Sequence, residues 1–445
     1  MDEFKRVITL FDAIVINMGA IIGAGIFVIV GLAAVKAGPS IVISILVSAL
    51  VALFTGLSFS KIASYVSKEG GVYEYAKDTL SMFSGFIGGW MWTFGNIIAV
   101  AAVSLSLGGY INTLFGTSMP TPYIAISAIL LFMTINIFGI KNSVRTLAIL
   151  VLLNISILAL FVVSGLPSFN ASNFSNPFPN GINGMMVGAS LIFFAFTGFS
   201  RVTTLSGEVI NPKKTIPRAI IISIILSTVI YLAVAVVLLG LVPYPSLAHS
   251  LSPLSQAISV LHNHLLLAII SLGGITATAA VAFTGILGTS RVFFAMGRDS
   301  ELPRTLGVID RFSTPMHAIL LSSALGVVFI LAISFGTIVG AANASILLSY
   351  LIINIAALNL TPNHPRHTTN GSILGGKFPI IPLLGIASIL AVMLYITPGS
   401  LSVAGLILAI GGIYYRVRNT PHRRGNPNVP VRSAVRVFGV SRRTG

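Results

Sequence analysis

The sequence predicts an all-α protein that crosses a membrane many times, and three observations lead to this prediction. Of its 445 residues, 55% are hydrophobic and only 8% are charged. The mean hydropathy is +0.98, whereas a soluble protein of this length needs far more charge to cover its surface. Apolar stretches recur along the whole chain and are long enough to cross a bilayer, which takes about 20 helical residues.

Twelve apolar segments are expected to form membrane helices, which we number as spans one to twelve. The expected bounds are 13–35, 39–62, 82–106, 122–140, 146–166, 184–206, 219–241, 264–290, 317–335, 338–360, 379–395 and 400–415. Pro398 and Gly399 interrupt the short last two spans, so eleven spans stay an alternative. Residues 1–415 then form one transmembrane domain.

The distribution of basic residues predicts the orientation, because Lys and Arg resist translocation. With the N-terminus inside, the outer loops hold only Lys36. The inner segments before the tail then hold a long basic set: Lys5, Arg6, Lys61, Lys68, Lys77, Lys141, Arg145, Lys213, Lys214, Arg218, Arg291, Arg298, Arg304, Arg311, Arg366 and Lys377. Both termini are therefore predicted to be cytoplasmic, and a prokaryotic cytoplasmic membrane is the expected location.

The tail at 416–445 is basic and holds no acid. Its arginines are Arg416, Arg418, Arg423, Arg424, Arg432, Arg436, Arg442 and Arg443. Attraction to anionic lipid headgroups, about 1 kcal/mol per basic residue near the surface, is one interpretation. A disordered tail that fixes topology is the other. The formal charge of +16 does not indicate nucleic acid, because the basic residues lie in loops and tail and not on an amphipathic face.

Several motifs of enzyme chemistry are missing. The chain has no cysteine, which excludes thiolate catalysis and cysteine metal sites. It also lacks a Gly-xxxx-Gly-Lys-Ser/Thr phosphate loop and a His-Glu-xx-His metal motif. We therefore expect no catalytic residues, no metal and no cofactor. The N-terminus runs into a long apolar stretch without a small-residue cleavage signature, so we interpret it as a retained span.

Glycines cluster in the middle of spans one and six. Gly19, Gly23 and Gly25 lie in span one, and Gly198 lies in span six. Glycine leaves helical dihedrals readily, so these helices are candidates for a mid-membrane break. Gly19-xxx-Gly23 is also a close-packing motif, and its spacing alone favours packing.

Breaks at corresponding places in two five-span halves are typical of inverted-repeat transporters, whose broken helices form a site at the membrane midplane. A half-helix N-terminus there binds a carboxylate, and freed carbonyls accept hydrogen bonds from an ammonium group. An α-amino acid carries both groups, so the backbone alone is able to recognise it.

Four ordered motifs carry a resemblance to a known family. They are Ile22–Phe27 (Ile-Gly-Ala-Gly-Ile-Phe), Gly70–Tyr75 (Gly-Gly-Val-Tyr-Glu-Tyr), Phe193–Pro212, and Arg291–Asp299 followed by Leu302-Pro303. Over spans one to ten the chain resembles the amino acid–polyamine–organocation (APC) transporter superfamily. It is most similar to the prokaryotic amino acid permeases and their cationic-amino-acid-transporter relatives.

The resemblance implies a five-plus-five inverted repeat, the leucine-transporter-like fold. Repeat one covers about 11–166, repeat two about 184–360, and two extra helices about 379–415. It also implies a substrate site at the two broken helices and a single working chain. The implied site residues are Ile22, Gly23, Ala24, Gly25, Phe194, Ala195, Thr197 and Gly198. In this scheme the amides of 23–25 bind the carboxylate, the carbonyls of Ile22, Phe194, Ala195 and Thr197 bind the amine, and Phe194 is a gating aromatic.

The chain departs from the family pattern where ion coupling is expected. Many proton-coupled relatives have a lysine in span five, and the matching residue here is Asn154, which cannot titrate. Span eight offers one hydroxyl, Thr278, where sodium-coupled relatives want a pair. Proton symport, uniport and exchange all stay open.

Arg201 in span six stands where relatives usually carry a small residue. We hypothesise that it supplies the positive charge otherwise given by the span-five lysine. The alternatives are snorkelling to headgroups or pairing with Glu208, which lies seven residues on and about two α-helical turns along the same face. Glu208 itself is a candidate proton carrier or inner-gate residue.

No acid lies in the middle of a span, so a cationic side chain would lack a buried partner. A small neutral amino acid is therefore the predicted substrate. Side-chain-pocket candidates are Trp92, Asn96, Phe196, Thr276 and Ser345, for each of which helix packing is the competing explanation. The functional alternatives are a passive channel or sensor on the same fold, or an exchanger of cationic amino acids or polyamines.

Overall fold

The computed structural model describes residues 6–66, 70–138, 144–310, 314–360 and 380–418, and this part of the chain is helical. Its α-helices are α1 (Leu10–Ala24), α2 (Val30–Ala37), α3 (Ile41–Ala63), α4 (Val72–Thr79), α5 (Met82–Phe115), α6 (Thr121–Ile137), α7 (Val144–Gly165), α8 (Gly181–Phe196), α9 (Pro212–Leu241), α10 (Pro253–Ser259), α11 (His264–Arg298), α12 (Met316–Ala332), α13 (Phe335–Asn359), α14 (Ile380–Met393) and α15 (Pro398–Arg418). Of the expected tail at 416–445, only 416–418 belong to the described residues.

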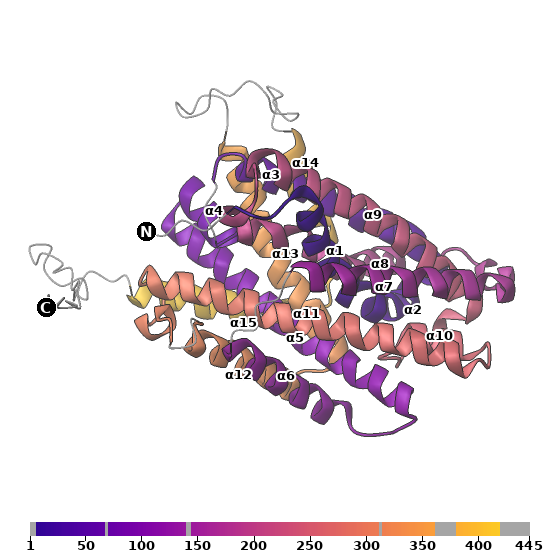
Figure 1. Ribbon diagram of the computed structural model, residues 1–445. Coiled ribbons are helices and arrows are strands. Elements are labelled where there is room, and N and C mark those ends of the chain that lie inside the picture. The colour runs from indigo at the N-terminus through magenta and orange to yellow at the C-terminus, as the bar shows by residue number, and fades with distance from the viewer. Residues whose placement is uncertain (1–5, 67–69, 139–143, 311–313, 361–379, 419–445) are drawn as a thin grey trace, which may run out of the picture.

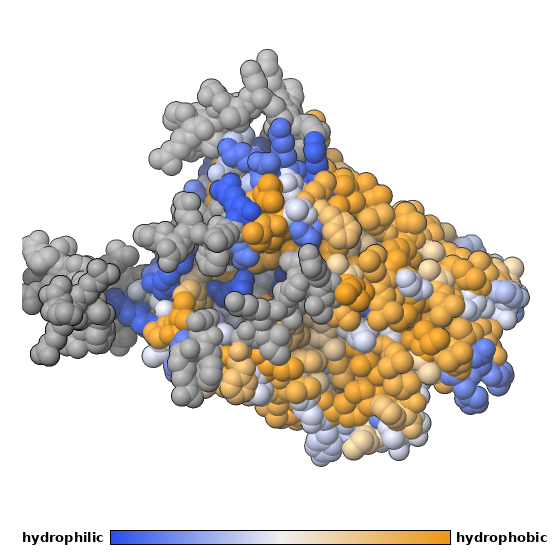
Figure 2. Space-filling view, in the orientation of Figure 1, coloured by the Kyte–Doolittle hydropathy of each residue, from blue (hydrophilic) through white to orange (hydrophobic). Residues whose placement is uncertain are grey.

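Eight of these helical stretches are long and apolar enough to cross a membrane. Three shorter apolar helices, α6, α12 and α14, accompany them. Figure 1 shows α5, α9 and α11 as long ribbons that slant across the molecule in broadly one direction. Figure 2 shows hydrophobic residues over most of the visible middle, with hydrophilic residues gathered toward the two ends. The chain is therefore a multi-pass helical membrane protein.

The observed helices follow the expected spans, with three main corrections. We expected span seven to begin at 219, but α9 begins at Pro212. We expected spans three and eight to end at 106 and 290, but α5 and α11 continue to Phe115 and Arg298. Both helices are long, with 34 and 35 residues, more than a bilayer requires. The hydrophobic pattern marks the part inside the membrane, and the helix continues beyond it.

The order of helix lengths occurs twice along the chain. A short helix of 8 residues, α4, precedes the 34-residue α5, and one of 7 residues, α10, precedes the 35-residue α11. Each long helix is then followed by an apolar helix of 17 residues, α6 or α12. The next element in each series is again long, α7 or α13.

The first span stays helical through its glycines. Between α1 and α2 lies a π-helical turn at Gly25–Ile29, and all five of its residues are buried. A π turn widens a helix locally and keeps its backbone bonded, so the expected unwinding does not occur in this conformation. The competing expectation, close packing at the glycines, agrees with the contacts described below.

The sixth span changes its helix type. α8 ends at Phe196, and a 3₁₀ segment, η5, follows at Thr197–Glu208 with non-helical dihedrals at Leu205. A 3₁₀ run of this length is uncommon, because its hydrogen-bond geometry is poorer than that of an α-helix. This is the irregular backbone that the sequence predicts for span six.

Two sets of contacts hold the end of the bundle that carries α4. In the first, which we call the α4–α11 clasp, Asp299 Oδ2 accepts hydrogen bonds from Lys77 Nζ at 2.6 Å and from the Tyr73 hydroxyl at 2.8 Å. Arg298 lies 3.8 Å from Glu74 across the same two helices. The clasp therefore joins the short helix before span three to the end of span eight.

The second set, the N-terminal pin, joins the start of the chain to the end of η5. The backbone N–H groups of Val7 and Ile8 donate to the Glu208 carbonyl at 2.9 and 3.0 Å. The N–H of Ile210 donates to the Ile8 carbonyl at 2.9 Å. Two segments about 200 residues apart thus share a short parallel pairing at Ile8 and Val209.

Candidate functional site

Spans one and six touch through their glycines. A Cβ built on Gly25 would lie 2.2 Å from the Cβ of Ala195. A Cβ on Gly198 would lie 2.5 Å from the backbone of Ala20 and 2.6 Å from the backbone nitrogen of Ile21. Only glycine permits so close an approach, so the predicted glycines bring the backbones of the two spans into direct contact.

Gly23 serves a different contact. A Cβ there would lie 2.2 Å from Val281 Cγ2 and 2.7 Å from the Ala277 carbonyl, both on α11. The three helical elements α1, η5 and α11 therefore converge where the sequence predicts the site. Gly23, Gly25 and Gly198 each permit this close approach because they have no side chain.

Three of the four predicted amine-binding carbonyls, those of Phe194, Thr197 and Ala195, accept hydrogen bonds from side-chain hydroxyls. Thr197 Oγ1 donates to the Phe194 carbonyl at 2.8 Å. The Tyr350 hydroxyl donates to the Thr197 carbonyl at 2.7 Å and lies 2.8 Å from Ser200 Oγ. Carbonyl groups freed by irregular backbone must find donors inside a membrane protein, and these hydroxyls supply them.

A second tyrosine joins both spans at once. The Tyr231 hydroxyl lies 2.7 Å from the Ile21 carbonyl and 3.0 Å from the Ala195 carbonyl. Its ring packs on Phe196 with a centroid distance of 5.2 Å. Tyr231 on α9 therefore holds spans one and six together at the predicted site.

Two further side chains bond the irregular backbone. The Tyr110 hydroxyl donates to the Phe27 carbonyl at 2.5 Å, within the π turn. Asn17 Oδ1 accepts from the backbone nitrogen of Val202 in η5 at 3.0 Å. In both places a backbone group in irregular helix is hydrogen-bonded by a side chain from another part of the chain.

Sequence reasoning did not include Tyr110, Tyr231 and Tyr350 in the site. All three are fully buried. A tyrosine in the middle of an apolar span needs a partner for its hydroxyl, and that was the available signal. The pattern shows the need for an acceptor, but only the folded chain shows which carbonyl is reached.

The remaining expected site residues are placed as follows. Ile22 and Phe194 are buried, and Ala24 ends α1. Phe196 is buried against Tyr231. Ser345 is buried with its hydroxyl unpaired, and its Cβ lies 3.1 Å from the position of a Cβ on Gly95.

Asn154 and Thr276, one from the coupling set and one from the pocket set, pair with each other. Thr276 Oγ1 donates to Asn154 Oδ1 at 3.0 Å, which joins α7 to α11. Thr276 also lies 3.1 Å from the Gly273 carbonyl. A neutral hydrogen bond therefore occupies the place that the resemblance assigns to a lysine in many relatives.

Arg201 lies against two other predicted pocket residues. Its Cζ is 5.6 Å from the centroid of the Trp92 ring, a cation–π distance. Its Nη2 lies 3.4 Å from Asn96 Oδ1, at the long limit for a hydrogen bond. Its Nη1 is buried and has no hydrogen-bond partner. The structure thus brings Arg201, Trp92 and Asn96 together.

The expected placement of Arg201 and Glu208 on one face is wrong. It assumed an unbroken α-helix, whereas η5 is a 3₁₀ segment with non-helical dihedrals at Leu205, between the two residues. Among the described residues no ion pair joins the two side chains. Glu208 takes part in the N-terminal pin through its carbonyl.

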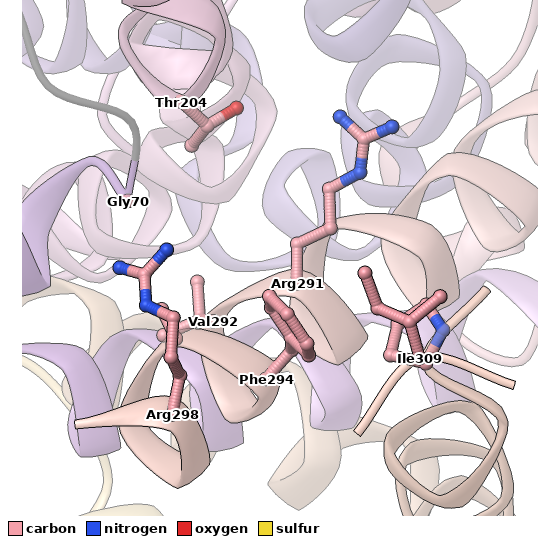
Figure 3. A pocket seen from close by; sticks show the side chains of 10 residues that line it. Gly70, Thr204, Arg291, Val292, Phe294, Arg298 and Ile309 are labelled. Atoms are coloured by element: carbon pink, nitrogen blue, oxygen red, sulfur yellow. The ribbon is translucent and has the colours of Figure 1, made fainter. Parts of the chain in front are cut away.

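A cavity of about 240 Å³ lies near the α4 end of η5 and α11. Its lining residues are Gly70, Thr204, Gly288, Arg291, Val292, Phe294, Ala295, Arg298, Ile309 and Pro315. Figure 3 shows Arg291 and Arg298 extending from α11 toward the side on which Thr204 lies. A Cβ on Gly288 would lie 2.7 Å from Arg201 Nη1, so the guanidinium lies against one of the lining residues.

Comparison with known proteins places this geometry in context. The sequence profile of the family described as amino acid permease matches residues 12–408. The branched-chain amino acid permease BcaP of Bacillus subtilis is 29% identical, with 95% of each chain covered. The methylthioribose transporter of the same organism is 30% identical over 94% of this chain and 95% of its own. The vacuolar cationic amino acid transporter 4 of Arabidopsis thaliana is 29% identical over 68% of this chain and 54% of its own.

Proposed function

Because this chain belongs to the amino acid permease family, we propose that it moves small, neutral L-amino acids across the membrane by alternating access. Members of this family are transporters and not enzymes. The observation that carries the proposal is the contact of spans one and six through Gly25 and Gly198, with hydroxyl donors on the carbonyls around it.

The proposed architecture is a twelve-span fold with a five-plus-five inverted repeat. Leu10–Ala63 counts as two spans, because Gly38 with φ of 59° turns the chain between α2 and α3. The three shorter apolar helices complete the number. The repeated order of helix lengths supports a first repeat at about 11–166 and a second at about 184–360, with α14 and α15 as the extra helices.

In the proposed site the substrate ammonium takes over the role of the tyrosine and threonine hydroxyls. The carbonyls of Phe194, Ala195 and Thr197 accept side-chain hydroxyls, and that of Phe194 also accepts the Thr197 N–H, so the ammonium binds by displacing these hydroxyls. The substrate carboxylate binds the amides at Gly23–Gly25 when span one opens there.

The neutral substrate class follows from the charges around the site. Asp299 and Glu74 are engaged in the α4–α11 clasp. Arg201 adds a positive charge beside Trp92 and Asn96, which opposes a cationic side chain. The names of the relatives range from branched-chain amino acids to methylthioribose, so the substrate needs a direct test.

For ion coupling we propose that Arg201 takes the place of the span-five lysine. The Asn154–Thr276 hydrogen bond is neutral, so no titration is available at that place. Glu208 is the remaining candidate for a proton carrier or an inner gate. A passive channel gives no counterflow, and a sensor binds without transport, so counterflow in liposomes distinguishes both from a transporter.

We propose a multi-pass protein of the cell membrane that works as a single chain, with both termini cytoplasmic. The α4 end of the bundle then faces the cytoplasm. Arg418, the last described residue, donates to the Ser300 carbonyl at 2.9 Å and so lies at that end. Contact with anionic headgroups is proposed for the tail beyond it, which lies outside the described residues.

The test is thermal unfolding of the purified protein in detergent with each of the twenty amino acids, several polyamines and methylthioribose. A ligand that binds only the folded state stabilises it by about 2.7 kcal/mol at a hundred times its dissociation constant. We expect a selective shift with one or a few neutral L-amino acids, and saturable uptake of the same compounds in liposomes. Stabilisation by polyamines or methylthioribose alone would overturn the substrate assignment.

Two glycine variants test whether the ligand-induced shift in thermal unfolding comes from binding at spans one and six. Gly25→Ala places a methyl group 2.2 Å from the Cβ of Ala195, so we expect it to abolish binding and uptake. Gly412→Ala on α15 meets nothing within 4 Å and is the matched control. Equal binding by both variants would contradict a site at spans one and six.

A further inference from the structure

Arg201 is a partly buried cation with a buried Nη1, and no acid among the described residues pairs with it. Its recorded partners are the neutral Asn96 amide, at a long 3.4 Å, and the face of Trp92. Its Nη1 has no hydrogen-bond partner. A charge held inside a membrane protein is costly unless it meets a partner or water, so this free donor needs an acceptor in the working cycle.

The position of Arg201 connects the proposed site with the cavity. It lies three residues after Gly198, which touches span one, and three before Thr204, which lines the cavity. Three residues of a 3₁₀ helix rise about 6 Å. The backbone of Arg201 therefore lies about one 3₁₀ turn from the contact of spans one and six at Gly198.

Buried polar atoms in native proteins are nearly always bonded, so an unpartnered buried donor points to a missing polar ligand. Arg201 Nη1 is such a donor. The hydroxyls of Thr93 on α5 and Ser345 on α13 are also buried without a partner. Ser345 packs at Gly95, which lies two residues from Thr93 and so on the opposite side of α5, and the two hydroxyls therefore do not share one site.

We propose that Arg201 Nη1 binds a side-chain oxygen of the transported amino acid. The substrates would then carry a carboxamide or a carboxylate on a short side chain, and would not be branched-chain aliphatic amino acids. This inference rests on the proposed transport of amino acids through this site, and a carboxylate side chain would extend the substrate class beyond the neutral one proposed above. A carbonyl-type oxygen of the substrate side chain accepts from Nη1.

The inference also explains why Asn96 and Trp92 hold the guanidinium only loosely. A carboxylate of the chain bonded to Arg201 would neutralise its charge and occupy the N–H donors that a ligand needs. The ring face and the long amide contact orient the guanidinium without saturating its donors. The side chain is thus kept available to a substrate that arrives from either side.

The experiment compares three ligands of nearly equal shape, namely L-leucine, L-asparagine and L-aspartate. Thermal unfolding in detergent and competition for uptake in liposomes give their affinities for the full-length protein. A hydrogen bond to a charged group contributes about 1.5–3 kcal/mol, so we expect asparagine, aspartate or both to bind at least about tenfold more tightly than leucine. Asparagine alone indicates a carboxamide site, and aspartate alone a carboxylate site.

Variants assign the preference to Arg201. Arg201→Met keeps a long side chain without its donors, so we expect the preference over leucine to disappear, while Arg201→Lys retains part of it. Arg218→Met, at an exposed position on α9, is the matched control and keeps the wild-type preference. Should Arg201→Met fail to fold, the wild-type ligand comparison and Arg201→Lys still decide.

The possible outcomes separate this inference from the proposed function. Tight binding of leucine, with asparagine and aspartate no better, overturns the inference and leaves an amino acid transporter. Unchanged preference in a folded Arg201→Met variant also overturns it. Failure of every amino acid to bind or to be transported overturns the proposed function itself.

Discussion

At the scale of the residue, single hydroxyl groups maintain the irregular backbone of spans one and six. Tyr231 reaches the carbonyls of Ile21 and Ala195, and Tyr350 reaches that of Thr197. In water such carbonyls would be hydrated, but in a membrane an unsatisfied group costs several kcal/mol. The tyrosines therefore permit irregular backbone at the site when no substrate is bound.

Replacing Tyr231 by Phe removes this bond and keeps the ring that packs on Phe196. Two carbonyls then lose a shared donor, so we expect the free energy of unfolding to fall by about 1–3 kcal/mol. Thermal unfolding measures the change, and Tyr123→Phe, at an exposed residue of α6, should leave stability unaltered. A Tyr231→Phe protein as stable as the wild type would show that the hydroxyl is dispensable.

At the scale of the element, the α4–α11 clasp fixes how a short amphipathic helix meets the end of span eight. Partial burial alone would raise the pKa of Asp299, but the hydrogen bonds from Lys77 and Tyr73 outweigh it and hold that pKa below its usual value. Burial alone would lower the pKa of Lys77, but its bond to Asp299 and the nearby carboxylates raise it.

These opposite shifts predict the pH range of the clasp. The contribution of Asp299 is present above its unfolded-state pKa, about 3.9, and is lost as pH falls through its lower folded-state pKa. That of Lys77 is present below about 10.4 and is lost as pH rises through its higher folded-state pKa. We expect Asp299→Asn to lower thermal stability between about pH 5 and 9, with the difference from wild type shrinking in acid. A difference that grows in acid would contradict the assignment.

At the scale of the whole molecule, much of the helical framework was predictable, because apolar length and glycine position depend on local sequence. Gly25 and Gly198 were chosen from the sequence, and the structure brings both into backbone contact. The π turn that replaces unwinding in span one was not predictable. It depends on neighbouring spans, including Tyr110, whose hydroxyl satisfies the Phe27 carbonyl.

The direction of the Arg201 side chain was also not predictable from the sequence. Its distance from Glu208 in sequence suggested a shared face, but that reasoning needed the helix type, which tertiary contacts determine. The partners, Trp92 and Asn96, lie about 100 residues earlier on α5. A buried charge is visible in a sequence, whereas its neighbours emerge only when distant spans pack together.

The orientation of the whole molecule is open to a direct test, because the chain contains no cysteine. Ser118→Cys lies in the exposed loop between α5 and α6, and Thr305→Cys lies at the α4 end beyond α11. With both termini cytoplasmic, a membrane-impermeant thiol reagent should label Ser118→Cys in intact cells and Thr305→Cys only after permeabilisation. The reverse pattern would invert the proposed topology.

The N-terminal pin has a mechanical consequence. Hydrogen bonds from the N–H groups of Val7, Ile8 and Ile210 join the beginning of the chain to the end of η5, so spans one and six are connected at the α4 end as well as at their glycines. Two helices that are connected at two separate places move as one rigid body. Opening toward the α4 end would then require spans one and six to move together.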